Sequence, residues 1–340
     1  MILNFEQIKE MTRGVERIVE NENGFVQFYR FSAEEEKAYS EHPRAAEFFP
    51  KTFHSSCVRW AFYTDSSYLA FDFSNGNGGK PSSGAAHLDL YENGSMVNHI
   101  TVEYKTQPKG RICLNLTEGK KLVELYFHYG TRMDVANVEL ADGSSFEGAH
   151  RKYKMLSYGD SITHGSSCTK PSLSYLAHIA ALLDADVINK GIGGEEFFPN
   201  LITATPSVDE PDFITVAYGT NDWKHRTQEM YEEYCAEFLT RLTALYPTKQ
   251  IFMITPTWRA DANIVTPFGA PATEIYPFIC KIAARFPNIT VIRGWDLVPH
   301  EKSFFADSRL HPNDLGFGIY TLNLYRALLP HMIEKLGYSL

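Results

Sequence analysis

The first 150 residues contain many short stretches in which apolar and polar residues alternate, as they do in β-strands. Residues 86–91 alternate clearly, and Asn93-Gly94 separates them from a second such stretch at 96–102. Asn-Gly between two alternating runs is typical of a two-residue hairpin turn. Short strands separated by turns indicate an all-β, jelly-roll-like sandwich over residues 1–148. Its other strands are predicted at 25–31, 68–73, 111–116, 121–127 and 133–140.

From about residue 150 the pattern changes to strands that alternate with helices. Residues 213–218 form an apolar run interrupted only by Thr215, as expected of a strand in a parallel sheet that is covered on both faces. Pro171 opens a helix with one apolar face, since proline is favoured at a first helical position. The alternation predicts a three-layer parallel α/β/α domain over residues 149–340, with 141–148 as the linker. Its strands are predicted at 153–157, 187–188, 213–218, 251–254 and 289–292, and its later helices at 228–246, 273–285 and 314–335.

Composition narrows the classes of partner. The chain has 340 residues and a net charge of −9, and it contains no basic run. We therefore expect no binding to nucleic acid or to an anionic membrane surface. The N-terminus lacks the pattern of a signal peptide, and the five cysteines are odd in number and widely spaced. These features favour a cytoplasmic protein with reduced thiols, while a homo-oligomer stays open.

Candidate chemistry lies at the ends of the predicted parallel strands. Gly159-Asp-Ser161 follows the first strand, and Gly191-Ile-Gly-Gly194 follows the second. Gly219-Thr-Asn-Asp222 follows the third strand, and His311 comes just before the last helix. Because such sheets bind ligands at the carboxyl ends of their strands, we expect these residues to share one edge.

The residue types at this edge fit nucleophilic catalysis by serine. A serine hydroxyl needs an adjacent base, and His311 suits that role near neutral pH. The oxyanion that forms needs donors, for which the Ser161 amide, the backbone at Gly194 and the Asn221 side chain are candidates. The sequence contains neither paired cysteines nor a His-Glu-x-x-His pattern, so it gives no support for a metal site.

The region from about 153 to 335 resembles the GDSL, or SGNH, hydrolases, whose four blocks centre on a serine, a glycine, an asparagine and a histidine. The matching segments are 158–163, 189–194, 219–222 and 311–313. The resemblance implies a flavodoxin-like α/β/α fold and ester hydrolysis without a metal or other cofactor. It also implies Ser161 as nucleophile, His311 as base, and Ser161, Gly194 and Asn221 as the oxyanion hole.

The sequence departs from the family pattern at one position. The triad aspartate of the family usually stands three residues before the histidine, where this chain has Ser308, and Asp307 stands four before. A one-residue bulge would bring Asp307 to the imidazole and complete a triad. Alternatively, a backbone carbonyl orients His311 and a serine–histidine dyad operates.

The order of the two halves is similar to that in carbohydrate esterase family two and related acetyl esterases, where a β-sandwich precedes the hydrolase domain. This second resemblance implies acetyl esters of sugars as substrates. Asp160, Trp223 and Trp258 are the candidate substrate-binding residues, because all three come after strands at the functional edge. Asp160 could instead brace the serine turn, and either tryptophan could instead be packed inside the fold.

Two other functions remain open from sequence alone. The chain could be a lysophospholipase or thioesterase, which would need a long apolar groove for its acyl chain. It could also be a carbohydrate-binding protein whose hydrolase domain is catalytically impaired. The sandwich could bind glycan, form a wall of the pocket or mediate subunit contact.

Overall fold

Antiparallel sheets make up the N-terminal part of the chain. The computed structural model describes residues 1–76, 84–203, 205–206 and 210–338. One sheet has the order β1-β4-β9-β6-β7, with β11 paired to β4, and the other has the order β2-β3-β10-β5-β8. The strands of the first sheet are β1 (Thr12–Arg13), β4 (Arg59–Thr64), β6 (Ala86–Glu92), β7 (Ser95–Val102), β9 (Lys121–Tyr126) and β11 (Glu147–Gly148). Those of the second are β2 (Arg17–Glu20), β3 (Val26–Tyr29), β5 (Tyr68–Asn75), β8 (Lys109–Asn115) and β10 (Met133–Leu140).

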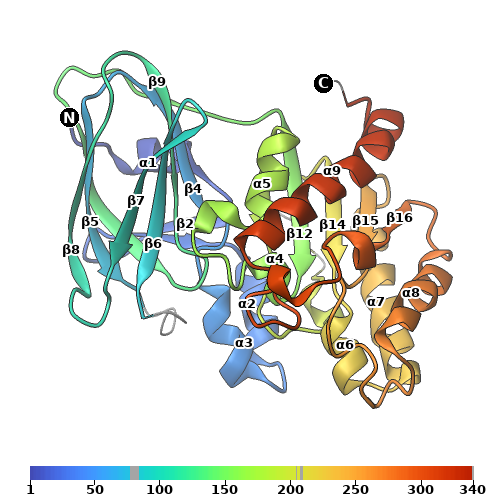
Figure 1. Ribbon diagram of the computed structural model, residues 1–340. Helices are drawn as coiled ribbons and strands as arrows, with labels where there is room; N and C mark the ends of the chain where they lie inside the picture. Colours follow the sequence, from blue (N-terminus) through green and yellow to red (C-terminus); the bar gives the residue numbers. More distant parts are fainter. Residues whose placement is uncertain (77–83, 204, 207–209, 339–340) are drawn as a thin grey trace.

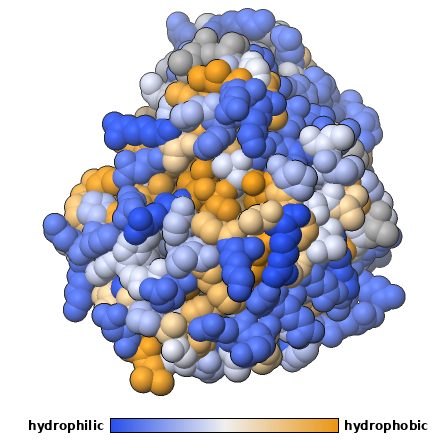
Figure 2. Space-filling model, turned by 90° about the vertical axis from the view of Figure 1, so that its right-hand side faces the viewer, coloured by the Kyte–Doolittle hydropathy of each residue, from blue (hydrophilic) through white to orange (hydrophobic). Residues whose placement is uncertain are grey.

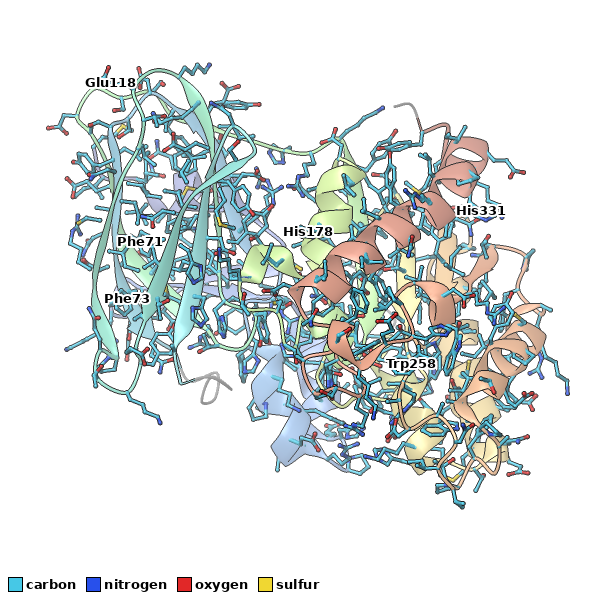
Figure 3. All side chains as sticks on the ribbon, viewed as in Figure 1. Phe71, Phe73, Glu118, His178, Trp258 and His331 are labelled. Carbon is cyan, nitrogen blue, oxygen red and sulfur yellow. The ribbon has the colours of Figure 1, made fainter. Side chains whose placement is uncertain are left out.

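Aromatic side chains fill the space between these two sheets. The Trp60 and Phe71 rings meet edge to face at 5.0 Å, and both side chains are fully buried. Figure 3 shows Phe71 and Phe73 within this N-terminal part. Asn93 and Gly94 both have positive φ, and Glu92 pairs with Ser95, so the hairpin predicted from Asn-Gly is confirmed.

A five-stranded parallel sheet forms the second part of the chain. Its order is β13-β12-β14-β15-β16. With β12 counted as the first strand, this is the 2-1-3-4-5 order of flavodoxin-like folds, so the predicted fold class is confirmed. The strands are β12 (Tyr153–Gly159), β13 (Ala185–Asn189), β14 (Phe213–Ala217), β15 (Gln250–Ile254) and β16 (Ile289–Ile292).

Helices cover both faces of the parallel sheet (Figure 1). On one face, α5 (Tyr175–Leu182) and α9 (Asp314–Leu336) pack together and share a core with Met155. On the other, α7 (Gln228–Leu245) and α8 (Ile275–Ala283) share a core with Leu156. Neighbouring residues of β12 thus face opposite layers. Shorter helices follow two of the strands, and 3-10 turns connect several elements; they are α4 (Ser161–His164), α6 (Thr220–His225), η1 (Pro171–Leu173), η2 (Pro199–Leu201), η3 (Ala272–Glu274), η4 (Gly294–Asp296) and η5 (Lys302–Phe304).

The N-terminal part also contains three helices, so the expectation of β structure alone before residue 150 is wrong. They are α1 (Phe5–Met11), α2 (Ala33–Ser40) and α3 (Ala45–Thr52). Each has seven or eight residues, too few for a clear helical period. Asn4 and Ser32 each form a capping box with the residue three positions later, which is the sequence signal that could have revealed α1 and α2.

Helices α2 and α3 contribute buried side chains to the core of the parallel-sheet domain. Figure 1 shows them beside α4, below the antiparallel sheets. Tyr39 and Phe48 are buried in the same apolar core as Leu156 and Ile192. The boundary proposed at residue 148 therefore separates the sheets in sequence, while the two parts share a core in space.

Buried charges reinforce this contact. Lys190 is fully buried, with its Nζ 2.8 Å from Glu16 Oε1 and 2.5 Å from Glu35 Oε2. Burial raises the pKa of Glu35, whereas the neighbouring ammonium of Lys190 acts in the opposite direction. Since each charge depends on its partner for the solvation that it has lost, the two parts of the chain are held in one arrangement.

The side of the molecule that carries α8 and β16 is mostly hydrophilic, with apolar side chains gathered near its centre (Figure 2). None of the helices within the described residues has both the length and the apolar character needed to cross a membrane.

Replacing Lys190 should destabilise the whole fold. We expect Lys190→Met to lower the free energy of unfolding by about 3–5 kcal/mol, because two carboxylates then stay buried without their cation. Urea denaturation measures this change. Arg285→Ala, which removes the exposed ion pair with Glu232, is the matched control and should cost at most about 1 kcal/mol. Equal, small effects of both substitutions would show that the buried cation has no special structural role.

Candidate active site

A pocket of about 500 Å³ lies where the carboxyl ends of the parallel strands meet the N-terminal part. Both parts supply its walls. The N-terminal part contributes Glu47, Lys51, His54, Tyr129 and Gly130. The other side consists of Ser161, His164, Ser166, Ser167, Gly193, Gly194, Asn221, Lys224, Arg259, Arg309, Leu310 and His311.

Ser161 begins α4 directly after β12. Gly159, at the end of the strand, is required there because a Cβ would lie 2.1 Å from Thr163 Oγ1. Asp160 Oδ1 accepts a hydrogen bond from the Ile162 amide at 3.0 Å and so caps the short helix. This tight strand-to-helix turn places Ser161 Oγ 2.8 Å from His311 Nε2, within hydrogen-bonding reach.

The second imidazole nitrogen of His311 meets a carboxylate. Its Nδ1 lies 2.9 Å from Asp307 Oδ2, so the extra residue in the loop does not prevent contact. Ser308 absorbs that residue by adopting a left-handed conformation with φ of 54°. The structure thus brings Ser161, His311 and Asp307 into one hydrogen-bonded line, and His311 is oriented by a side chain.

Asp307 is also fixed by its own loop. Its Oδ1 accepts hydrogen bonds from the amides of Arg309, Leu310 and His311 at 2.9, 2.7 and 3.1 Å. Partial burial favours the neutral acid, but the hydrogen bonds from the Leu310 amide, the His311 side chain and the His311 amide outweigh it and lower the pKa of Asp307 to about 2. Asp307 is therefore a carboxylate at every pH where the protein would be assayed.

Three segments that line the same pocket carry candidate hydrogen-bond donors. Gly194 has a φ of 88°, a conformation that favours glycine, and a Cβ there would lie 3.0 Å from Glu47 Oε1. Asn221 uses one of its side-chain N–H groups to reach Glu195 O at 2.8 Å, which orients the amide. The Ser161 amide belongs to the first turn of α4, where amides have no acceptor within the helix. These groups can stabilise negative charge on a bound carbonyl oxygen.

The loop that contains Gly194 is held from the N-terminal part. Lys51 Nζ donates to Gly193 O at 2.6 Å. The buried Arg30 guanidinium donates to the carbonyls of Asn189 and Gly191, and also to His54 O at 2.5 Å. Because these are carbonyl contacts, they fix the path of the backbone independently of the side chains on the loop.

His164 connects the serine helix to this loop. The Gly193 amide donates to His164 Nδ1 at 3.1 Å, so the ring proton is on Nε2, which lies 3.0 Å from Tyr129 O. Burial, together with the nearby positive charge of Arg30, keeps the pKa of His164 well below its ordinary value. His164 therefore stays neutral and is a poor candidate for the base.

The sequence profile of the GDSL-like Lipase/Acylhydrolase family matches residues 157–319, a range that contains Ser161, Gly194, Asn221 and His311. Residues 157–319 form a GDSL-like lipase/acylhydrolase domain. The protein is an ester hydrolase with the type of domain that its sequence motifs predicted. A search of curated proteins finds no match.

Solved structures share the fold of the GDSL-like domain together with the preceding sandwich. Salicylyl-acyltransferase SsfX3 from a tetracycline biosynthetic pathway has 20% identity and a TM-score of 0.77, over 95% of this chain and 94% of that one. A protein from Bacteroides ovatus described as a GDSL-like lipase has 17% identity and a TM-score of 0.74, over 100% and 98%. A family two carbohydrate esterase from Cellvibrio japonicus has 15% identity and a TM-score of 0.67, over 98% and 97%. At these identities the likeness concerns the fold.

The structure does not bring the three predicted substrate-binding residues into the pocket. Trp223 is fully buried, its indole N–H donates to Ala270 O at 2.9 Å, and the Arg259 guanidinium lies 4.4 Å from the centre of its ring. A sugar therefore cannot stack on Trp223, and that prediction is wrong. Trp258, labelled in Figure 3, packs between His300 and Phe305 instead of lining the pocket.

Asp160 is a structural residue of the GDSL-like domain. It is almost fully buried, caps α4 and is absent from the walls of the main pocket, so its assignment to substrate binding is also wrong. Sequence reasoning missed Lys51, His54 and Tyr129, because no motif marks them and the pairing of the two parts is a long-range contact. It also missed Arg309, although that residue stands two positions before His311.

Asp160 should make stability depend on pH. Burial raises its pKa to about 7, although the Ile162 amide and the positive charge of Arg259 act in the opposite direction. From about pH 4 to pH 7 the folded chain retains a proton that the unfolded chain releases, so this carboxyl's contribution to stability falls as pH rises. Asp160→Asn keeps an oxygen for the Ile162 amide and should remove that dependence, so the variant gains stability relative to the parent as pH rises.

Urea denaturation of both proteins at about pH 5 and about pH 7 measures the difference. Asp160→Ala is the control: its stability should depend on pH in the same way as that of Asp160→Asn, with a further loss of about 1 kcal/mol in the free energy of unfolding from the missing cap. Parallel stability curves for the parent and Asp160→Asn would contradict the assignment of a raised pKa.

Proposed function

We propose that the protein hydrolyses short acyl esters, with Ser161 as nucleophile, His311 as general base and acid, and Asp307 as the residue that orients His311. The single observation that carries the proposal is the alignment of the three side chains. Ser161 Oγ is 2.8 Å from His311 Nε2, and His311 Nδ1 is 2.9 Å from Asp307 Oδ2. Such an arrangement activates a hydroxyl that is otherwise a weak nucleophile.

The reaction would proceed through an acyl-enzyme. Ser161 Oγ bonds to the ester carbonyl carbon while its proton passes to His311 Nε2. The carbonyl oxygen becomes an oxyanion, which the amides of Ser161 and Gly194 and the Asn221 side chain would stabilise. Collapse of this intermediate breaks the bond to the alcohol oxygen, which takes the proton from His311. Water then attacks the acyl-serine with the same base, which releases the acid and restores Ser161.

The lining of the pocket supports a short acyl group. Among the lining residues within the described part of the chain, Leu310 is the only one with a branched aliphatic side chain, and the others are mostly polar, charged or glycine. A long acyl chain would need an extended apolar wall to replace water. We therefore favour an acetyl ester over the substrates of a lysophospholipase or a long-chain thioesterase.

The alcohol part of the substrate is proposed to be a carbohydrate. Support comes from the shared two-part fold with family two carbohydrate esterases and from the polar walls that both parts contribute. The aligned serine, histidine and aspartate argue against a domain that only binds carbohydrate, because binding alone does not require them. In this proposal the N-terminal part forms a wall of the pocket.

Hydrolysis of esters of increasing acyl length tests the proposal. We expect the acetyl ester to be turned over with the highest kcat/KM, and Ser161→Ala to lower kcat by at least about 1,000-fold. Chromogenic acetyl, butyryl and octanoyl esters of one alcohol provide the series. An increase in rate with acyl length would instead indicate a lipid or thioester substrate. If the parent protein turned over no ester in a Ser161-dependent way, the esterase proposal would be abandoned.

A separate variant tests the orienting carboxylate. Asp307→Asn should lower kcat by about 100- to 10,000-fold, because an amide favours the wrong tautomer of His311. The amide oxygen can still accept hydrogen bonds from the loop amides, so the fold should be retained, and circular dichroism checks this. Full activity of the folded variant would support a serine–histidine dyad instead.

A further inference from the structure

The pocket carries positive charge although the chain as a whole is acidic. Lys51, Lys224, Arg259 and Arg309 line it, and Glu47 is the one carboxylate among its described lining residues. The whole chain has a net charge of −9. Cations gathered in a concave site raise the local potential and attract anionic ligands.

Two carboxylates, Asp261 and Asp307, lie beside the two guanidinium groups of this pocket. Asp261 is shared: its Oδ1 lies 2.6 Å from Arg259 Nε and its Oδ2 lies 3.2 Å from Arg309 Nη1. Asp307 is 3.8 Å from Arg309, but it already accepts from the His311 ring. Arg309 keeps 41% of its side chain exposed, so its guanidinium can take a further partner.

Lys224 has no such compensation. It is exposed on α6, three residues after Asn221, and it lines the pocket. No ion pair or hydrogen bond joins its ammonium group to another residue in the part of the chain that the structure describes. By contrast, the Lys51 ammonium lies 2.6 Å from Gly193 O and 3.3 Å from Glu47 Oε1, so its charge is already used to hold the loop that contains Gly193. Within the described residues, the unpartnered charge of the pocket is therefore the ammonium of Lys224, and the partly exposed Arg309 can take a further partner beside it.

We propose that the alcohol part of the ester carries an anionic group, a carboxylate or a phosphate, which Lys224 and Arg309 bind. The inference rests on the proposed esterase function. The leaving alcohol takes its proton from His311, so it lies on the His311 side of the scissile bond, and Arg309 is two residues away in the same loop. A guanidinium and an ammonium suit oxyanions of either kind, since both donate charge-assisted hydrogen bonds.

The walls of the pocket support an anionic rather than a neutral sugar. Recognition of an uncharged sugar commonly uses an exposed aromatic face, but Trp223 and Trp258 are packed elsewhere and Tyr129 is the one aromatic ring among the described lining residues besides histidine. Charge pairing can replace stacking as the source of specificity.

The test compares matched acetyl esters by kcat/KM. The substrates are an O-acetylated glucuronate, its neutral uronamide, and an O-acetylated glucose phosphate with its unphosphorylated counterpart. We expect each anionic ester to exceed its neutral partner by about tenfold or more, and the preference to fall as salt is added. The larger of the two ratios identifies carboxylate or phosphate as the group bound.

Variants assign the preference to the two cations. Lys224→Gln and Arg309→Gln should each reduce the ratio of anionic to neutral turnover several-fold, and the double variant should bring it near one. Lys224→Arg should retain most of it. Lys335→Gln, near the C-terminal end of α9 and outside the pocket lining, is the control and should leave the ratio unchanged. The ratio is the readout because Arg309 also approaches Asp307, so its replacement can change the absolute rate.

The outcomes separate the two proposals. Ser161-dependent turnover with no preference for either anionic ester overturns the anionic alcohol and leaves the esterase function standing. If a succinyl ester of a neutral sugar is turned over faster than the acetyl ester, the anionic group that the pocket recognises belongs to the acyl part. That result also overturns the inference. Absence of any Ser161-dependent ester turnover overturns the esterase proposal itself.

Discussion

The path of the chain from Asn189 to Glu195 depends on buried charges supplied from far away in the sequence. Lys190 is paired with Glu16 and Glu35, and the Arg30 guanidinium donates to backbone carbonyls on both sides of Lys190. Because buried charges are costly without partners, this arrangement has few alternatives. The amide at Gly194 and the carbonyl at Gly193 are consequently fixed by the N-terminal part, whereas the serine is fixed at the end of a strand of the parallel sheet. The pocket is therefore complete only when the N-terminal part is packed against the parallel-sheet domain.

The histidine side of the site is organised locally instead. Asp307 binds three consecutive amides of its own loop, and the left-handed Ser308 lets the carboxylate reach His311 from four residues away. Short-range order of this kind tolerates a change in spacing, since the contact requires an oxygen near Nδ1 rather than a fixed number of residues. Although the spacing departs from that of the family, Asp307 still makes the carboxylate–imidazole contact with His311.

Much of the fold follows from the sequence, because it depends on local periodicity. The apolar run at β14, the turn at Asn93-Gly94 and the helix α9 all lie close to their predicted limits. The motif residues Ser161, Gly194, Asn221 and His311 share one edge because parallel strands end together. What escaped prediction depends on long-range packing. Helices α2 and α3 are too short to show a period, and the burial of Trp223 under Arg259 is decided by a loop that comes later in the chain.

The hairpin of α2 and α3 lies between β3 and β4 yet belongs to neither antiparallel sheet. It supplies Glu47 and Lys51 to the pocket wall, and none of the strand pairings of the two antiparallel sheets includes its residues. In evolutionary terms, a segment of this kind can diversify substrate choice without a change in the strand pairings on either side of it. Its buried face against the glycine loop limits that freedom, so divergence should concentrate on the residues of the hairpin that face the pocket. Selection on substrate and selection on folding would then act on opposite faces of one short segment.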